Sequence, residues 1–286
     1  MFISGFADEA GADLATQIRA HKELGWDHID LRNIDGCQFT DVSDEQFDSI
    51  YGKLQDAGLS VSCFEGGIAN WATKISEPLS ASITTLERCI PRMNKMGTKY
   101  IRGMTWPNDG LGDDDWRDEV VRRYKELAKI AEDGGIVIAV ENCDGWASQS
   151  AKNYGRFFEL VDSKGICAAY DTGNPASHGG TDTWDWYIAA KPYIDYVHIK
   201  SHTGSVDGGE GQHTYPGEGI SMELETLTDL FKNGYDGGIV IEPHMAAVVH
   251  IDKTITDEEA AYNTYIEYGR RAEKLIEEAL KLVNIK

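Results

Sequence analysis

The chain has 286 residues, with 48 aspartates and glutamates against 27 lysines and arginines, which gives a formal net charge of −21 at pH 7. Such an acidic protein repels the phosphates of nucleic acids and anionic membrane surfaces, so neither is expected as a partner. The five cysteines are odd in number and contain no C-x-x-C pair, which argues against a disulfide framework and a thiolate zinc site. The apolar runs are too short to span a bilayer and no secretory leader is evident, so we expect a cytoplasmic protein.

Short β-rich runs recur along the whole chain, and an amphipathic helical segment follows each of them. This alternation is typical of a parallel sheet built from right-handed crossovers. Eight such units can be drawn, with strands expected over residues 2–6, 28–32, 60–64, 100–104, 136–141, 166–171, 196–200 and 238–242.

The helical segments carry start and stop signals. Asp13 is expected to cap the first helix and Gly25 to end it, and Ser43 with Gln46 predicts a capping box. A long last helix is expected over residues 257–282. Five further glycines precede strands and are expected to act as left-handed helix C-caps, namely Gly58, Gly97, Gly134, Gly165 and Gly234.

No linker, low-complexity tract or charge block interrupts the eight units. We therefore expect one domain over residues 1–286, an α/β fold that is a single (β/α)8 TIM barrel. The longest connection, residues 201–221, follows the seventh strand and is rich in glycine. It is interpreted as a lid or substrate loop, with a plain surface loop as the alternative.

Four polar side chains lie at the carboxyl ends of the last four expected strands, where barrels of this kind place their functional residues. They are Glu141, Asp171, His198 and Glu242. Three carboxylates and one imidazole suit one divalent cation, Mn²⁺, Mg²⁺ or Co²⁺, and Zn²⁺ is also compatible. Any one of them alone could be an ordinary strand-end residue, but their repetition at equivalent positions predicts a shared metal site.

Strand parity adds one cation to this prediction. Residues two apart on a strand share a face, so Lys200 points to the same side as His198. It is a candidate catalytic residue that stabilises a developing oxyanion, and a salt bridge to a ligand carboxylate is the alternative.

With these residues in place, the chain resembles the sugar phosphate isomerase/epimerase-like barrels, the superfamily that contains xylose isomerase, ketose 3-epimerases, inosose dehydratase and endonuclease IV. The motifs are VEN, DTGNP, HIK, IEPH and the PGEG at residues 216–219, and the resemblance covers essentially the whole chain. It implies that Glu141, Asp171, His198 and Glu242 bind one catalytic metal. It also implies that Glu141 and Glu242 serve as acid and base.

Two positions depart from the family pattern. Ketose 3-epimerases of this type usually carry a histidine where this chain has Asn174, and the histidine that often follows the first metal glutamate is replaced within Asn142–Asp144. Metal-dependent proton transfer is therefore better supported than one particular epimerisation.

Several further residues are candidate substrate contacts. Aromatic side chains in loops beyond strands can stack on the C–H face of a sugar, and arginine recognises carboxylate or phosphate. Core packing or pairing with Glu65 or Asp8 is the alternative for these residues. The candidates are Trp71, Trp106, Arg102, Asn174, His202, His213 and Glu218.

The expected function is that of a metal-dependent isomerase or epimerase, which removes a proton beside the carbonyl of a ketose or related polyol and passes through an enediolate. A lyase is the alternative, either a keto-inositol dehydratase or a C-glycoside cleaving enzyme. A non-catalytic polyol-binding subunit and an endonuclease IV-like phosphodiesterase are less favoured, the latter because the sequence lacks the additional histidines and the basic groove. The acidic helix faces are compatible with a homo-oligomer.

Overall fold

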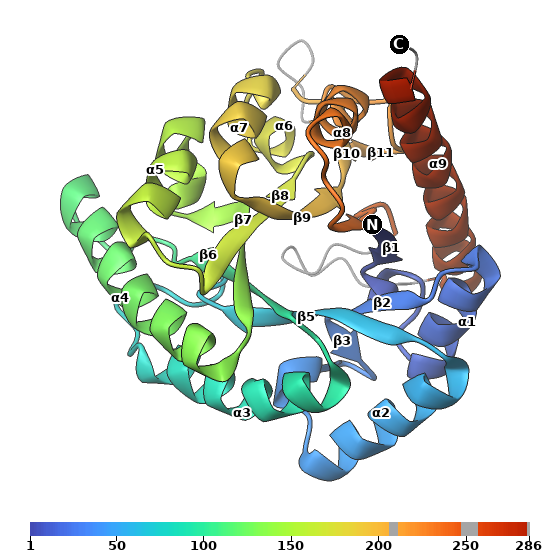
Figure 1. Ribbon diagram of the computed structural model, residues 1–286, viewed down its shortest axis with the longest axis horizontal. Helices are drawn as coiled ribbons and strands as arrows, with labels where there is room; N and C mark the ends of the chain where they lie inside the picture. The colour runs from blue at the N-terminus through green and yellow to red at the C-terminus, as the bar shows by residue number, and fades with distance from the viewer. Residues whose placement is uncertain (206–210, 247–256, 285–286) are drawn as a thin grey trace.

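The computed structural model describes residues 1–205, 211–246 and 257–284. Eight strands form one parallel sheet in the order β1-β12-β9-β8-β7-β6-β5-β2. A parallel bridge between Phe6 and Asp30 brings β1 next to β2, so the sheet closes on itself. Figure 1 looks into this ring of strands, with the helices around the outside. The predicted single (β/α)8 barrel is confirmed.

All eight expected strands are present, and most end within one or two residues of their predicted limits; β5 and β7 run about four residues longer. Their bounds are β1 Phe2–Gly5, β2 His28–Leu31, β5 Ser60–Ile68, β6 Tyr100–Thr105, β7 Val137–Gly145, β8 Ile166–Asp171, β9 Ile194–Ile199 and β12 Gly238–Ile241. The two short ribbons, β3 Asn33–Ile34 with β4 Cys37–Gln38 and β10 Ser201–His202 with β11 His213–Thr214, were not expected from the sequence.

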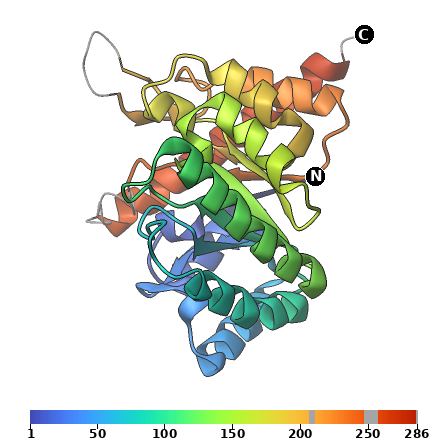
Figure 2. The ribbon, with the colours of Figure 1, turned by 90° about the vertical axis from the view of Figure 1, so that its left-hand side faces the viewer.

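Helices connect consecutive barrel strands and cover the outer face, as the side view in Figure 2 also shows. Their bounds are α1 Leu14–Leu24, α2 Asp44–Ala57, α3 Ser80–Met96, α4 Asp113–Gly134, α5 Ala151–Val161, α6 Asn174–Ser177, α7 Thr183–Ala190, α8 Glu223–Lys232 and α9 Glu258–Asn284. None of the described helices is both long and apolar enough to cross a membrane.

The expected cap of α1 by Asp13 and the capping box of Ser43 and Gln46 are both confirmed. Two of the glycine predictions are wrong. Gly134 is the last residue of α4, and Gly135, with φ of 72°, is its left-handed cap. After α5 the left-handed residue is Asp162 rather than Gly165. Gly165 is needed for space, because a Cβ there would come within 2.2 Å of the Ala128 carbonyl oxygen.

The inside of the barrel is packed rather than open. Its apolar interior consists of seven buried side chains from the strands: Phe6, Cys63, Ala139, Cys167, Ala169, Tyr196 and Val240. The carboxylate of Asp30 is buried beside them, and it accepts hydrogen bonds from Ser4 Oγ at 2.6 Å, Ser62 Oγ and Tyr196 OH at 2.7 Å. These small and apolar side chains support the ligand-bearing strand ends from below.

Candidate metal centre

The four predicted ligands meet at one end of the barrel. Glu141 lies on β7, Asp171 is the last residue of β8, His198 lies on β9, and Glu242 directly follows β12. In the parallel register Asp171 is opposite His198, which is opposite Val240 on β12. One ligand atom from each of the four lies within 4.8 Å of the others, and all four side chains are buried. The closed barrel therefore brings Glu141 and Glu242, which are 101 positions apart in the sequence, into one cluster.

Backbone hydrogen bonds fix the orientation of the Asp171 carboxylate. The amides of Gly173 and Asn174, at the start of α6, donate to Asp171 Oδ1 at 2.8 and 2.7 Å. The other oxygen, Oδ2, is buried and has no well-directed hydrogen bond among the described residues, and it faces the Lys200 ammonium at 3.0 Å. Glu242 Oε2 is in the same situation, with Lys200 Nζ at 2.5 Å.

Aromatic rings and one carboxylate hold the imidazole of His198. Phe6 and Tyr196 meet it edge-on, with ring centroids 5.1 and 5.9 Å away. Its Nδ1 lies 3.4 Å from Glu141 Oε1, and its buried Nε2 lies 4.0 Å from Glu65 Oε1. Within the described ranges of the chain, neither Nε2 nor Glu65 Oε1 has a hydrogen bond. Nδ1 thus points into the ligand cluster, and Nε2 points toward a second carboxylate.

These residues fit a divalent cation. Carboxylate oxygens left without well-directed hydrogen bonds point into the cluster beside an imidazole nitrogen, which is the donor set that Mg²⁺, Mn²⁺, Co²⁺ or Zn²⁺ accepts. Burial lowers the pKa of His198, but the hydrogen bond and charge of Glu141 outweigh it and raise the pKa to about 9. Since a metal ligand must be the neutral imidazole, binding of an ion is expected to release this proton.

Two arginines and one lysine among the described residues contribute to balancing the buried carboxylates around the cluster. Arg102 lies 2.9 Å from both Glu65 and Glu141. Burial raises the pKa of Glu141, but the guanidinium of Arg102 outweighs burial and lowers it to about 2. Arg102 was predicted as a substrate contact, with pairing to Glu65 as the alternative. The structure shows the pairing with Glu65, and Arg102 also neutralises Glu141.

Arg32 is a charge partner of Glu242, and Lys200 lies between Asp171 and Glu242. The Arg32 guanidinium lies 2.9 Å from Asp8 and 3.2 Å from both Glu9 and Glu242. Lys200 is 2% exposed, and its ammonium contacts two ligand carboxylates. Lys200 therefore lies beside the predicted ligands, and it makes the salt bridges that were predicted as the alternative to a catalytic role.

Asn174 connects the ligands with Lys200. Its side-chain amide donates to Glu141 Oε1 at 3.1 Å, and its carbonyl oxygen accepts from Lys200 Nζ at 3.1 Å. The residue that departs from the epimerase pattern is thus part of the cluster.

A small recess of about 60 Å³ is lined by Glu242 and Lys200, and a cavity of about 520 Å³, which none of the four predicted ligands lines, lies beside it. Trp71, Cys143 and His244 line both, so the two spaces adjoin. Five of the predicted substrate contacts line one or both spaces, namely Trp71, Arg102, Asn174, His202 and His213, and Lys200 lines the recess. The antiparallel pairing of β10 with β11 sets His202 opposite His213. Part of the predicted lid, residues 206–210, lies outside the described residues.

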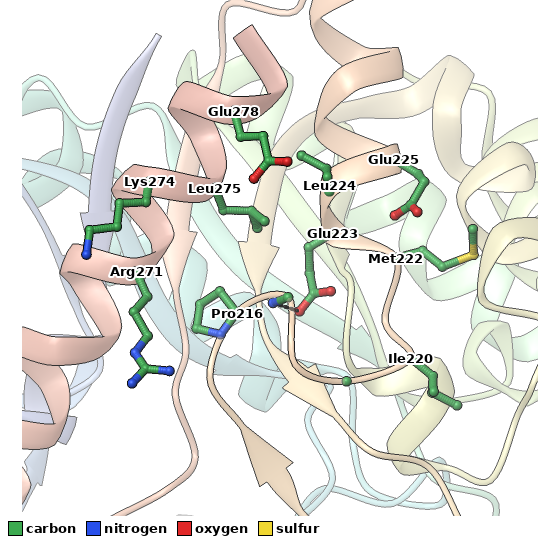
Figure 3. A pocket seen from close by; sticks show the side chains of 12 residues that line it. Pro216, Ile220, Met222, Glu223, Leu224, Glu225, Arg271, Lys274, Leu275 and Glu278 are labelled. Atoms are coloured by element: carbon green, nitrogen blue, oxygen red, sulfur yellow. Dashed lines mark hydrogen bonds between the residues drawn. The ribbon is translucent and has the colours of Figure 1, made fainter. Parts of the chain in front are cut away.

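Two predicted contacts do not line these spaces. Trp106 is fully buried and packs on Tyr124 and Arg123 of α4, which is the core-packing alternative. Glu218 is paired with Arg271 on α9 and accepts a hydrogen bond from Thr214 Oγ1. The PGEG segment borders a different cavity of about 480 Å³ between α8 and α9, shown in Figure 3. None of the residues lining that cavity is one of the four predicted ligands.

Neither Glu9 nor His244 was singled out from the sequence. The backbone amide of His244 donates to Glu9 Oε2 at 2.7 Å, and its Nδ1 lies 3.0 Å from Glu9 Oε1. The ring Nε2 of His244 lies 3.7 Å from Glu242 Oε1, so this histidine borders the ligand cluster rather than being an ordinary loop residue. The position of His244 two residues after Glu242 was the signal in the sequence that could have identified it.

Curated relatives match part of the chain. An inosose dehydratase of Yersinia enterocolitica is 28% identical over 145 residues, which are 46% of this chain and 48% of the relative. An inosose dehydratase of Geobacillus kaustophilus is 25% identical over 232 residues, 71% of this chain and 73% of the relative. The chain thus spans about half of the first relative and about three quarters of the second.

Solved structures with the same fold cover nearly the whole chain. One is a D-psicose 3-epimerase from Clostridium cellulolyticum with D-tagatose, at a TM-score of 0.72 and 17% identity over 96% of this chain and 99% of the other. Another is a xylose isomerase-like TIM barrel protein from Mycobacterium smegmatis with magnesium, at a TM-score of 0.71 and 16% identity over 96% and 97%. The family model described as xylose isomerase-like TIM barrel matches residues 18–272, and the chain therefore belongs to the xylose isomerase-like TIM barrel family.

Proposed function

We propose that this protein is a divalent-metal-dependent enzyme that removes a proton from the carbon beside the carbonyl of a ketose or keto-polyol, and that isomerisation or epimerisation follows. The convergence of Glu141, Asp171, His198 and Glu242 within 4.8 Å, beside a cavity large enough for a sugar, carries the proposal. Structural neighbours that contain D-tagatose and D-allulose support a small sugar-like ligand.

The four ligands would hold one ion, Mn²⁺, Mg²⁺, Co²⁺ or Zn²⁺. When bound, the ion polarises the carbonyl and its neighbouring hydroxyl and so acidifies the C–H between them. Glu141 and Glu242 act as the proton-transfer pair, one taking the proton and the other, or the same one, returning it. Arg102 and Arg32 keep these two carboxylates ionised and in place.

Lys200 places a positive charge beside the reacting carbons. It is anchored by Asp171 and Glu242, and Asn174 accepts a hydrogen bond from its ammonium. Its charge stabilises the oxyanion of the enediolate that forms as the proton leaves. Around it, Trp71 presents an aromatic face, and His202 and His213 present ring nitrogens toward substrate hydroxyls.

Dehydration is the second candidate, and the inosose dehydratases among the curated relatives favour it. It requires the same proton abstraction, after which a hydroxyl group on the neighbouring carbon leaves. The C-glycoside cleaving reaction expected from the sequence is a further elimination of the same kind. The fate of the enediolate therefore separates the candidates.

Solvent exchange tests the shared step. Protein stripped with a chelator and reconstituted with Mn²⁺ is incubated in D₂O with a panel of ketoses and keto-inositols, and NMR follows deuterium in recovered substrate and product. We expect metal-dependent incorporation that is lost in Glu141→Gln and retained in the control Glu267→Gln, whose side chain lies on the outer helix α9. Isomeric product supports isomerase or epimerase and an unsaturated product supports dehydratase, whereas the absence of exchange across the panel contradicts the proposal.

A further inference from the structure

A second group of potential ligands lies in the interior of the barrel, apart from the four predicted ligands. Asp30 on β2 and Cys63 and Glu65 on β5 each offer one donor atom, and these atoms lie within 4.8 Å of one another, the limit that the four predicted ligands also meet. The strand register sets Asp30 opposite Cys63. Cys63 and Glu65 are two residues apart on one strand and so face the same side. The three side chains therefore converge in the barrel interior.

No cationic side chain balances the charge of Asp30. Its side chain is 0% exposed, and three hydroxyl groups donate hydrogen bonds to it, but no lysine, arginine or histidine in the described part of the chain forms an ion pair with it. Buried charges are normally paired or bound to a metal ion. The hydroxyls orient the carboxylate without neutralising it, as the groups behind a metal ligand do.

Glu65 also lacks well-directed partners. It is 0% exposed, and within the described ranges neither of its oxygens has a hydrogen bond. Its Oε1 lies 4.0 Å from His198 Nε2, which is too far for a hydrogen bond. Its Oε2 lies 2.9 Å from Arg102 Nε, but Arg102 also contacts Glu141. One guanidinium thus faces two carboxylates and leaves the charge of Asp30 without compensation.

The donor atoms of this group differ from those of the predicted metal centre, because one of them is sulfur. A thiolate selects Zn²⁺ or Co²⁺ over Mg²⁺ and Mn²⁺. The sulfur of Cys63, one oxygen of Asp30 and the two oxygens of Glu65 provide the four donors of a tetrahedral ion. Burial, and after it the charges of Glu65 and Asp30, raises the pKa of Cys63. A coordinated ion reverses this effect, since it takes up the negative charge and the thiol proton leaves to solvent.

We propose that Asp30, Cys63 and Glu65 bind a second divalent ion, of the Zn²⁺ class, which stabilises the barrel interior and takes no part in the proposed reaction. Each of the three side chains is at most 1% exposed. The ion therefore enters during folding or through slow opening of the barrel, and it resists a chelator that strips the predicted metal centre. Through Glu65 it also supports the position of His198.

Cobalt tests the proposal, because a thiolate bound to Co²⁺ gives a charge-transfer absorption in the near ultraviolet, and carboxylate and imidazole ligands do not. Protein produced in cobalt-supplemented medium is dialysed against a chelator, and the bound cobalt is counted by elemental analysis. We expect about one ion per chain to remain, together with the absorption, after the ion at the four predicted ligands has been removed.

Three cysteine variants locate the ion. Cys63→Ser should lose both the retained ion and the absorption. Cys167→Ser and Cys143→Ser should keep both, since Cys167 is another buried thiol of the barrel interior and Cys143 lines the cavity beside the predicted metal centre. The inference is overturned if the native protein shows no absorption, if the absorption persists in Cys63→Ser, or if either control loses it.

X-ray absorption at the zinc edge gives an answer without a variant, should Cys63→Ser fail to fold. For native protein produced with zinc and treated with chelator, we expect one sulfur at about 2.3 Å and oxygens at about 2.0–2.2 Å. Oxygen and nitrogen ligands alone, or no retained zinc, overturn the inference. Deuterium exchange at the predicted metal centre is measured separately, so the proposed function and this second site can each fail alone.

Discussion

Replacing Lys200 by methionine should destabilise the metal-free protein far more than the metal-loaded protein. The Lys200 ammonium is 2% exposed and lies 3.0 Å from Asp171 Oδ2 and 2.5 Å from Glu242 Oε2. Removing one partner of a buried ion pair costs about 3–5 kcal/mol, because the remaining charges have no compensation. A divalent ion bound by the same two carboxylates would supply that compensation.

The stabilisation expected from metal binding can be compared with the cost of removing Lys200. An ion at 100 times its Kd stabilises the folded protein by about 2.7 kcal/mol. In Lys200→Met the ion no longer competes with an ammonium for Asp171 and Glu242, so its affinity and its stabilising effect should both exceed those in the native protein. Mn²⁺ should therefore recover most of the stability lost in the variant, while turnover stays low.

Urea unfolding at pH 7, in chelator and in Mn²⁺, measures both effects, and titration calorimetry measures the affinity. Lys191→Met is the matched control, since its ammonium lies 2.5 Å from Asp229 Oδ2 but both side chains are about 30% exposed. That pair should contribute at most about 1 kcal/mol, with no dependence on metal. The reasoning is refuted if Lys200→Met loses under about 1 kcal/mol in chelator, or if Mn²⁺ stabilises both lysine variants equally.

Four further changes have expected outcomes. Glu65→Gln should weaken metal binding by about tenfold to a hundredfold, because Glu65 Oε1 lies 4.0 Å from Nε2 of His198 and helps to orient the ring; unchanged affinity in calorimetry would argue against this positioning role. Gly145→Ala should destabilise by about 2 kcal/mol or more, since φ is 92° and the new Cβ would lie 2.2 Å from the Thr105 carbonyl carbon. By contrast Gly52→Ala, in an open position of helix α2, should stabilise by about 0.5–1 kcal/mol in the same unfolding assay. Burial lowers the pKa of His21 from 6.5 to about 4, so the unfolded chain binds a proton that the folded protein does not, and stability is lost as pH falls from about 6.5 to 4. His21→Gln should flatten this part of the pH profile, by up to about 3 kcal/mol, and an unaltered slope would contradict the assignment.

The four candidate ligands could be predicted from the sequence because the position of each is local to its own strand. The run ICAAYD predicts that Asp171 ends a strand and faces inward, and IVIAVE predicts the same facing for Glu141, although β7 continues to Gly145. Barrel closure makes the carboxyl-terminal parts of all strands neighbours. The same parity correctly placed Lys200. These features depend on alternation along a few residues and need no knowledge of distant contacts.

The charge pairing around the ligands was decided by the tertiary structure. Arg32 and Glu242 are 210 residues apart, and Glu9 and His244 are 235 apart, so no local pattern links them. Trp71 and Trp106 likewise look alike in sequence, as aromatic residues in loops after strands, yet one lines the cavity and the other packs under α4.

The sequence by itself thus determined the barrel and the side chains delivered to its rim, because the spacing of apolar and polar residues within each unit specifies both. Only the tertiary structure decided which carboxylate each cation neutralises, which loops line the cavity and which aromatic ring is covered. The reason is physical: strand direction is set by neighbours along the chain, whereas the energy of a buried charge depends on every group around it in space.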